Sequence, residues 1–501
     1  MKRYITILMV LACAIASAQN ITDVLQYSRE NLQGTARFQA MGGAFGALGG
    51  DLSALNTNPA GSAVFNTNFF TISATHYNRD NDTRYENIVS GTKASTTDIN
   101  QAGGVFIYKK ANDNSYWKKI ALAFNYDVVQ NFNNSFTASG RSNQGIDTYF
   151  SNFAQGVPLG DIRLQDNEYI EEAYLDIGAN FGFGDQQAFL GYFGGILDPS
   201  EDTNANTSYI SNTKYTTVDH HFLEKTSGYN SKFTANIAAQ YQDNLYVGAS
   251  LNFHTIVYEK LTEFTESGYD ADSRIKRTIF DNLLHTEGTG FSLNLGLIAK
   301  LNNNVRIGGS YQSPTWYRLQ DETSQRINSD LADDDISFIN FDVVNVFETH
   351  TIKTPAKLTG SIAIIFGKDG LLSFDYDYQD MSKAELRPTS DSSFSNVNKT
   401  ILNELGTVST FRLGGEYRID NVSLRGGYTF KQSPYVNGNT IGELTGYSAG
   451  VGYSFGPNRI DLSLNRIEQD VDKQLFDTGI ITPAKINARN TNITLSYSIN
   501  L

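Results

Sequence analysis

The chain has 501 residues, of which 40% are hydrophobic and 12% aromatic, and its formal net charge is −14 at pH 7. A chain this acidic is repelled by phosphate backbones, so nucleic-acid binding is excluded. The mean hydropathy is −0.33, and no apolar run of transmembrane-helix length follows residue 18. A helical membrane protein is therefore not expected, although a transmembrane β-barrel would hide its apolar residues at every second position.

The first residues have the pattern of a secretory signal. Two basic residues precede a short apolar run, and Ala16-Ser17-Ala18 fits the small-residue rule for cleavage. This predicts a signal peptide over 1–18 and a mature chain that starts at Gln19. The alternative is a lipoprotein signal processed at Cys13, which would leave an unusually short apolar run. Under the first interpretation the only cysteine is removed, so the mature chain has neither a disulfide nor thiolate chemistry.

The mature length requires several domains or one hollow domain. Removal of 18 residues leaves 501 − 18 = 483, whereas single cores stop growing at about 250–300 residues. The C-terminal residues favour the hollow domain, because Ile493, Leu495 and Tyr497 alternate strictly with small polar residues. Such alternation is typical of a strand with one apolar and one polar face.

Fourteen segments with this alternation are expected to be strands, with boundary errors of a few residues. They are 69–77, 103–109, 119–131, 230–242, 244–264, 288–301, 305–321, 351–366, 370–380, 408–420, 422–432, 443–455, 459–468 and 490–501. Every second connection is short, whereas the others run from about ten residues to nearly a hundred, the longest being 132–229. Short turns on one side and long loops on the other are typical of outer-membrane barrels.

We therefore expect an all-β fold: a 14-stranded antiparallel transmembrane β-barrel over residues 67–501, with both ends of the barrel on the short-turn, periplasmic side. The alternative is a soluble, secreted β-sandwich. The 28 Tyr and 31 Phe favour the barrel, because aromatic girdles form at both membrane interfaces.

The residues before the first predicted strand are small and turn-forming, and they lack sustained alternation. Glycine allows tight turns, and the residue before a proline is extended. We expect residues 19–66 to fold as a plug, or hatch, inside a barrel too wide for its own side chains to fill. The alternative is a disordered tail, for which Leu52 and Phe65 are too apolar. The residues assigned to the hatch are Gly42, Gly43, Asn56, Asn58, Pro59 and Gly61.

Several stretches carry a resemblance to a known family, and they occur in the family's order. They are "MGGAFGALGG" with "ALNTNPAG" (41–61), "RIGGSYQSPT" (306–315), "KTPAKLTGSIAIIF" (353–366) with "LSFDYDYQDMS" (372–382), and "FRLGGEYRIDNVSLRGGYTFKQSPY" (411–435). Together they resemble the FadL/TodX (OMPP1) family of outer-membrane transporters for long-chain fatty acids and hydrocarbons. The resemblance implies a fourteen-strand barrel with an N-terminal hatch, ligand capture at the outer loops, and sideways release near Phe124–Val128. Residues 132–229 depart from the family pattern, so the ligand stays open.

The alternation also places the polar faces of the strands inside the lumen, since an Arg or Lys facing lipid at the midplane would cost about 2–4 kcal/mol. One interpretation is a polar wall that grips the hatch, in part through Arg and backbone carbonyls. The other is pairing within the wall, such as Glu416 with Arg425. The residues assigned to this polar wall are Arg306, Asp375, Asp377, Arg412, Glu416, Arg418 and Arg425.

Apolar side chains crowd into residues 174–197 of the longest connection, which should lie outside the membrane. Exposed apolar patches of that size usually bind something. We therefore expect a ligand-capture surface there, or alternatively a cap that packs on itself. The residues assigned to capture are Phe181, Phe183, Phe189, Tyr192 and Phe193.

Three other patterns are weaker. "GYSAG" (446–450) matches the G-x-S-x-G hydrolase elbow, but that elbow needs a strand, a sharp turn and a helix, whereas a strand pattern continues here. His220-His221 are expected to be solvated in a loop. "DLADDDIS" (330–337) could hold a divalent ion, although a solvated acidic loop is favoured. No catalytic residue, metal or cofactor is assigned.

The sequence thus predicts a monomeric outer-membrane channel, plugged by a hatch and in contact with membrane lipids and lipopolysaccharide. It would pass hydrophobic small molecules, such as long-chain fatty acids or aromatic hydrocarbons, without energy input. The steps expected are capture, transfer to an apolar pocket, hatch rearrangement and release. The alternative is a non-transporting barrel that binds protein partners, like the PorV component of a secretion system.

Overall fold

The structure is a computed structural model that describes residues 20–109 and 115–501. The predicted signal peptide, its cleavage site and Cys13 lie outside these residues. The α-helices are α1 (Ile21–Ser28), α2 (Ala36–Ala40), α3 (Ile146–Ala154), α4 (Ile170–Phe181), α5 (Phe183–Phe193) and α6 (Ser392–Glu404). The 3-10 helices are η1 (Leu52–Asn56), η2 (Pro59–Val64), η3 (Leu159–Asp161), η4 (Asp334–Phe338) and η5 (Met381–Lys383).

The strands are β1 (Phe69–Tyr85), β2 (Ile88–Lys109), β3 (Trp117–Asn131), β4 (Asn134–Ser142), β5 (Leu197–Pro199), β6 (Tyr209–Ser211), β7 (Val218–Tyr241), β8 (Leu245–Ser267), β9 (Arg277–Lys300), β10 (Val305–Gln312), β11 (Trp316–Ser329), β12 (Asn345–Val346), β13 (His350–Lys353), β14 (Lys357–Phe366), β15 (Gly370–Asp380), β16 (Glu385–Arg387), β17 (Thr407–Ile419), β18 (Val422–Lys431), β19 (Ile441–Phe455), β20 (Asn458–Lys473) and β21 (Ala484–Asn500). Within the described residues, no helix is both long and apolar enough to cross a membrane.

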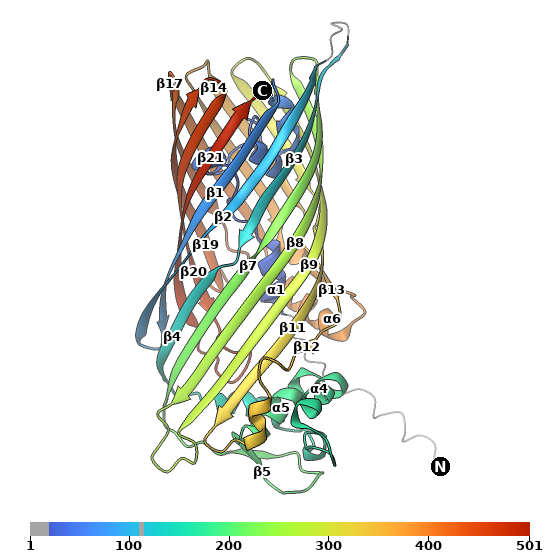
Figure 1. Ribbon diagram of the computed structural model, residues 1–501, viewed down its shortest axis with the longest axis vertical. Helices are drawn as coiled ribbons and strands as arrows, with labels where there is room; N and C mark the ends of the chain where they lie inside the picture. Colours follow the sequence, from blue (N-terminus) through green and yellow to red (C-terminus); the bar gives the residue numbers. More distant parts are fainter. Residues whose placement is uncertain (1–19, 110–114) are drawn as a thin grey trace, which may run out of the picture.

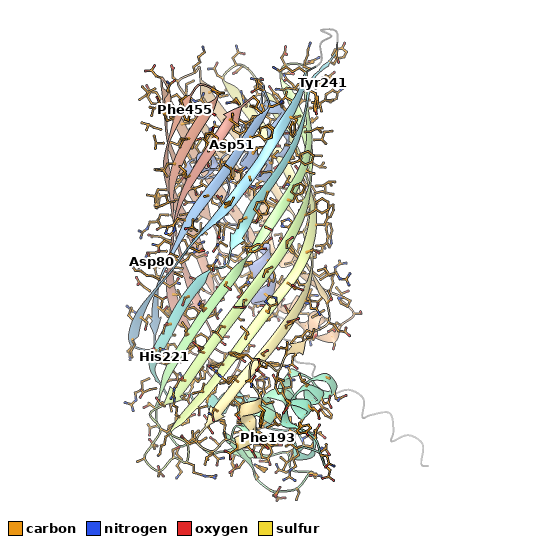
Figure 2. All side chains as sticks on the ribbon, in the orientation of Figure 1. Asp51, Asp80, Phe193, His221, Tyr241 and Phe455 are labelled. Carbon is orange, nitrogen blue, oxygen red and sulfur yellow. The ribbon has the colours of Figure 1, made fainter. Side chains whose placement is uncertain are left out.

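The strands form one closed antiparallel barrel, because β21 pairs with β1 as well as with β20 (Figure 1). Some neighbouring strands are two halves of one wall strand, as β3 and β4, β10 and β11, or β13 and β14 are. Counted in this way, the described residues give fourteen wall strands, and the expected fold class is confirmed. The C-terminus lies at the upper end in Figure 1, which also carries the short turns and is called the short-turn end below. The opposite end, toward which His221 and Phe193 lie in Figure 2, is called the long-loop end.

Several strands are longer than the alternation predicted, always toward the long-loop end. β1 and β2 continue until only Glu86 and Asn87 separate them, so the expected loop of some 25 residues after residue 77 is wrong. Their outward side chains there are mostly polar, with Val89 and Ile99 as exceptions, and a strand outside the membrane needs no apolar face. β7 has 24 residues; at about 3.3 Å per residue and a tilt near 40°, it rises about 60 Å, roughly twice the hydrocarbon thickness.

Prolines mark two of the bends that divide wall strands. Ser313-Pro314-Thr315 separates β10 from β11, and Thr354-Pro355-Ala356 separates β13 from β14. The two bends lie side by side, since Thr315 N donates to Thr354 Oγ1 at 2.9 Å and Thr354 N donates to Thr315 O at 2.9 Å. Proline cannot donate to a ladder, so strands are interrupted where it stands.

The register of β17 and β18 can be checked by cysteine labelling. Leu413, Tyr417 and Leu424 point outward and are 48–58% exposed, so single cysteines there should react with a lipid-soluble maleimide. Cysteines at Arg412 and Arg425 should resist it, because these side chains face the lumen. The reverse pattern would mean that the register is wrong by one residue, since a slip of one flips every side chain.

Candidate functional site: the filled lumen

Residues 20–65, called the N-terminal segment below, run through the inside of the barrel (Figure 1). A capping box starts α1: Asn20 Oδ1 accepts from the backbone N of Thr22 and Asp23, and the Asp23 carboxylate accepts from Asn20 N at 2.9 Å. Further on, Gly42 and Gly43 have φ values of 61° and 76°, a region that favours glycine. The segment can therefore turn tightly enough to pack within the lumen.

The Asn-Pro-Ala-Gly motif is the part of the N-terminal segment that docks on strands β7 to β10. Asn58 Nδ2 donates to Gly46 O at 2.7 Å and to Leu297 O of β9 at 2.9 Å, while Asn58 Oδ1 accepts from Ala60 N. From β7, Asn236 Nδ2 donates to Pro59 O at 3.0 Å. The asparagine thus holds the turn and binds the wall with the same side chain.

Neighbouring residues of the motif complete its packing. Gly61 contacts Gly49 so closely that a Cβ on Gly61 would lie 3.1 Å from Gly49 Cα. The backbone also closes here, because Gly50 N donates to Gly61 O at 3.1 Å. Asn56 lines the cavity described below.

Glycines on the wall make room for the N-terminal segment. A Cβ added to Gly296 would lie 2.0 Å from Asn58 Oδ1, and one added to Gly308 would lie 2.2 Å from Gly46 O. On the other side of the barrel, a Cβ on Gly427 would lie 2.3 Å from Gly42 N. A wall side chain cannot fit at such distances, so the wall backbone lies directly against the segment: against its backbone at Gly308 and Gly427, and against the Asn58 side chain at Gly296.

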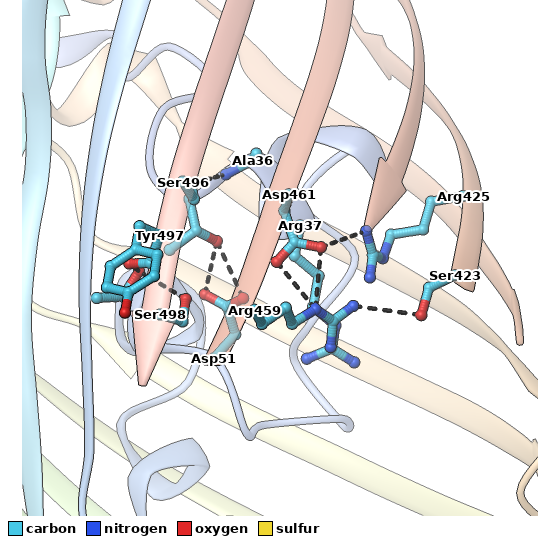
Figure 3. A network of polar contacts seen from close by, with 12 residues as sticks. Ala36, Arg37, Asp51, Ser423, Arg425, Arg459, Asp461, Ser496, Tyr497 and Ser498 are labelled. Carbon is cyan, nitrogen blue, oxygen red and sulfur yellow. Dashed lines mark hydrogen bonds and ion pairs between the residues drawn. The ribbon is translucent and has the colours of Figure 1, made fainter. Parts of the chain in front are cut away.

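Buried charges join the N-terminal segment to strands β17, β18 and β20 (Figure 3). Glu416 accepts from Arg37 Nε of the segment at 2.9 Å and from Arg425 Nε of the wall at 2.6 Å, and it also pairs with Arg418. Arg425 Nη1 donates to Asp461 at 2.8 Å. The same carboxylate therefore makes a contact within the wall and a contact with the segment, which are the two kinds of contact that the sequence left open.

The remaining polar-wall residues also contact the segment or each other. Arg306 Nη1 donates to the backbone oxygen of Leu48 at 3.1 Å, and the Asp375 carboxylate accepts from Gly46 N at 3.0 Å. Arg412 Nη2 donates to Asp377 at 2.7 Å and lies 3.7 Å from Asp375. Arginine to backbone carbonyl is thus one of the contacts that hold the segment.

A cavity of about 120 Å³ lies in the lumen between the N-terminal segment and the wall. Apolar and charged side chains both line it, including Leu32, Phe38, Val128, Val129, Leu444 and Ile467 on the one hand, and Glu30, Asp127, Asp377, Lys232, Lys357, Lys431 and Arg412 on the other. Among the residues described, the buried atoms Gln33 Nε2, Arg412 Nε and Asn465 Nδ2 have no hydrogen-bond partner. All three residues line the cavity, which is therefore a polar chamber with an apolar side.

Helices α3, α4 and α5 pack together beside the long-loop end, where they form a cap (Figure 1). Of the residues assigned to capture, Phe189 is fully buried, and its ring lies 4.6 Å from that of Phe193. Phe183, Tyr192 and Phe193 are half-buried, and only Phe181 is largely exposed, at 49%. The five side chains therefore do not share one open surface in this structure.

Hydrogen bonds fix the cap to the wall. Tyr174 of α4 donates to Gln325 Oε1 of β11 at 2.8 Å, and Gln187 of α5 donates to the same oxygen at 2.9 Å. Burial raises the pKa of the Tyr174 hydroxyl well above its ordinary value, so that it stays a neutral donor. The cap is thus a packed part of the fold rather than a loose loop.

The wall ladder is interrupted between β3 and β4. The ladder between β2 and β3 begins at the pair of Lys109 with Lys119 and ends at the pair of Gln101 with Asp127. Among the described strands, β4 pairs only with β7. Residues 88–100 of β2 and strand β4 are joined by side chains instead: Thr92 Oγ1 donates to Ser135 O at 2.7 Å. The resemblance implies sideways release near Phe124–Val128. Residues 124–127 lie within the ladder with β2, and the interruption begins at Val128.

Three weaker sequence patterns have other roles. Ser448 of "GYSAG" donates to Ala40 O of the N-terminal segment at 3.0 Å, within the continuous strand β19. His220 is not solvated as expected: it is buried, with Nε2 2.9 Å from Glu266 Oε2, because β7 extends through this stretch. Asp330 accepts from two backbone N–H groups, and Asp333 caps η4. In residues 20–109 and 115–501, no group of three or more His, Cys, Asp or Glu is placed to hold a metal ion.

Comparison with known proteins gives a family and a fold. The profile of the family described as outer membrane protein transport protein (OMPP1/FadL/TodX) matches residues 203–494. No curated protein sequence matches the chain. Among solved structures, a Pseudomonas aeruginosa FadL homologue is similar with a TM-score of 0.54 and 11% identity, covering 94% of this chain and 99% of its own.

The P. putida toluene transporter TodX is similar with a TM-score of 0.50 and 14% identity, with the same coverage of both chains. At such identities the structures support the fold alone, while the family profile spans 292 residues, more than half of the chain. The closed fourteen-strand barrel and the N-terminal segment inside it agree with this assignment. The chain therefore belongs to the OMPP1/FadL/TodX family of outer-membrane transport proteins.

Proposed function

We propose that this chain carries amphipathic molecules, such as long-chain fatty acids, passively through the outer membrane. The observation that supports this is the cavity between the N-terminal segment and the wall, which combines apolar with charged lining. Four cations, Lys232, Lys357, Lys431 and Arg412, stand there against the three carboxylates of Glu30, Asp127 and Asp377. A compound with an anionic head and an apolar tail suits this lining better than a plain hydrocarbon.

Passage requires the N-terminal segment to move. The cavity of about 120 Å³ is no larger than an engineered cavity of roughly 150 Å³ that holds one benzene molecule, so it is too small for a long acyl chain. Leu32 and Phe38 of the segment form part of the cavity boundary. Displacement of residues 20–33 would enlarge the cavity, while residues 34–65 are held by the wall glycines and the Glu416 contacts described above.

Binding of dodecanoate to the purified protein tests this proposal. Lys232→Gln together with Lys431→Gln removes two cavity cations that form no ion pair within the described residues, and dodecanoate affinity should fall about tenfold, or about 1.4 kcal/mol. Dodecanol, which lacks the charge, should bind both proteins alike. Equilibrium dialysis in neutral detergent measures both ligands.

The matched control is Lys93→Gln, which removes an outward lysine whose side chain is 82% exposed. It should bind dodecanoate as the wild type does. If the wild type binds no member of a panel of fatty acids and aromatic hydrocarbons, the transport proposal is wrong.

One observation favours a second candidate, a barrel that binds protein partners. The cap is closed by its own packing, with Phe189 and Leu190 fully buried, so it offers no open groove to a small ligand. Stable co-purification with a secretion subunit, combined with no ligand binding, would favour this scaffold.

A further inference from the structure

We propose that the short-turn end carries an anion-binding site formed by Lys119, Lys300 and Arg306, none of which lines the cavity described above. The three side chains come from β3, β9 and β10, and strands β7 and β8 lie between β3 and β9 in the wall. This arc of the wall lies at the upper end in Figure 1. In a barrel whose short turns face the periplasm, the site would be open to the periplasm.

Two of the three cations lie over the ring of Tyr246 in β8. Lys119 Nζ lies 6.0 Å from the centroid of the Tyr246 ring, and Lys300 Nζ lies 5.0 Å from the same centroid. Lys300 also stands directly opposite Arg306 in the ladder between β9 and β10. Like charges directly opposite each other destabilise a sheet, so this arrangement is costly unless an anion compensates it.

No carboxylate in residues 20–109 and 115–501 forms an ion pair with any of the three cations. The other side of the same mouth differs, because Arg418, Arg425 and Arg459 are paired with Glu416 and Asp461. The contrast is marked in a chain whose net charge is −14. The arc of Lys119, Lys300 and Arg306 is therefore a local excess of positive charge rather than part of a general basic surface.

Two of the cations are presently bound to backbone oxygens of the N-terminal segment. Lys119 Nζ donates to Phe65 O at 2.6 Å, and Arg306 Nη1 donates to Leu48 O at 3.1 Å. Both bonds have a charged donor and a neutral acceptor, and an anionic acceptor would add Coulomb attraction between opposite charges. An anion that reached this site would therefore compete with the segment for both side chains, and binding would loosen the segment at Leu48 and Phe65.

The chemistry of the ligand is a carboxylate or a phosphate, either free or as the head of an amphiphile. The amphiphile case rests on the proposed function, and it would make this site the exit toward the periplasm for the head group that the cavity binds first. The site itself does not depend on transport, because Lys300 and Arg306 are partly exposed in the absence of any movement.

Lys300→Gln tests the site with two probes, decanoate and inorganic phosphate, measured by equilibrium dialysis at low ionic strength. Lys300 lies over the Tyr246 ring, and the bonds to carbonyl oxygens of the segment come from Lys119 and Arg306 instead. The substitution therefore removes a charge without releasing the segment. The expected result is an affinity at least about tenfold weaker for the site's anion, with Lys300→Arg close to the wild type. Lys368→Gln, which removes an exposed charge from the turn after β14, should have no effect.

Each outcome has one meaning. Weaker binding of both probes by Lys300→Gln supports a general anion site. Weaker binding of decanoate alone assigns the head group of an amphiphile as the ligand, and weaker binding of phosphate alone assigns a free inorganic anion. If Lys300→Gln binds both probes as tightly as the wild type, the site does not exist. The transport proposal fails on other results: the wild type binds no fatty acid or aromatic hydrocarbon, or the Lys232 and Lys431 variant binds dodecanoate as tightly as the wild type. Neither result affects phosphate binding at the short-turn end.

Discussion

Deletion of residues 20–61 should convert the closed barrel into a pore that conducts small ions. Except for the interruption between β2 and β4, the wall strands pair with one another around the ring, so the wall does not need the N-terminal segment for its backbone pairing. A fourteen-strand barrel is too wide for wall side chains alone to fill. Single-channel recording in planar bilayers should show long open events for the deletion variant and a baseline near zero for the wild type.

The control for this deletion is the fold of the barrel itself. Heat-modifiable gel mobility should be retained, because β1 to β21 stay intact. Loss of folding would show instead that the segment nucleates the wall, and a folded but non-conducting barrel would show that the cap closes the lumen without the segment.

Glu416→Gln should be the most destabilising single substitution among the polar-wall residues. Glu416 is 3% exposed and pairs with Arg37, Arg418 and Arg425. Its neutralisation removes the counter-charge of Arg37 and leaves Arg425 with Asp461 alone. Removing one partner of a buried ion pair typically costs about 3–5 kcal/mol. The free energy of unfolding in urea, followed by tryptophan fluorescence, measures the loss.

Glu468→Gln is the matched control, because Glu468 pairs with Arg466 on the outer wall and both side chains are about half exposed. Exposed ion pairs contribute about 0–1 kcal/mol, so this variant should unfold nearly as the wild type does. Equal effects of the two substitutions would contradict the structural role assigned to Glu416.

The sequence predicted the wall well, because every wall strand carries its own period-two signal. Ile493, Leu495 and Tyr497 lie outward in β21, between 44% and 54% exposed, as their alternation implied. The extensions of β1, β2 and β7 toward the long-loop end were missed, since strands outside the bilayer have polar outward faces. The sequence there lacks the alternation of apolar and polar residues that marks a strand, although the backbone ladder continues.

For the contacts in the lumen, the sequence predicted their chemical type but not which residues make them. Polar side chains facing inward implied a polar wall, yet only the structure shows that Glu416 meets Arg37 across 379 positions of sequence. Wall glycines such as Gly296 and Gly427 were not identified, although a glycine on the lumen face of a strand is a signal of close backbone approach. The cap was foreseen as one of two alternatives, because apolar crowding alone does not say whether Phe189 is exposed or packed.

The movement of residues 20–33 is the central claim, and a reversible cross-link tests it most directly. Glu30 of the N-terminal segment pairs with Lys357 of β14, so cysteines at both positions can be joined by a short, thiol-cleavable cross-linker. Uptake of radiolabelled dodecanoate into vesicles containing the protein should fall to the protein-free level when the pair is joined. It should recover when dithiothreitol releases the link. Uptake that is equally fast in both states would contradict the account.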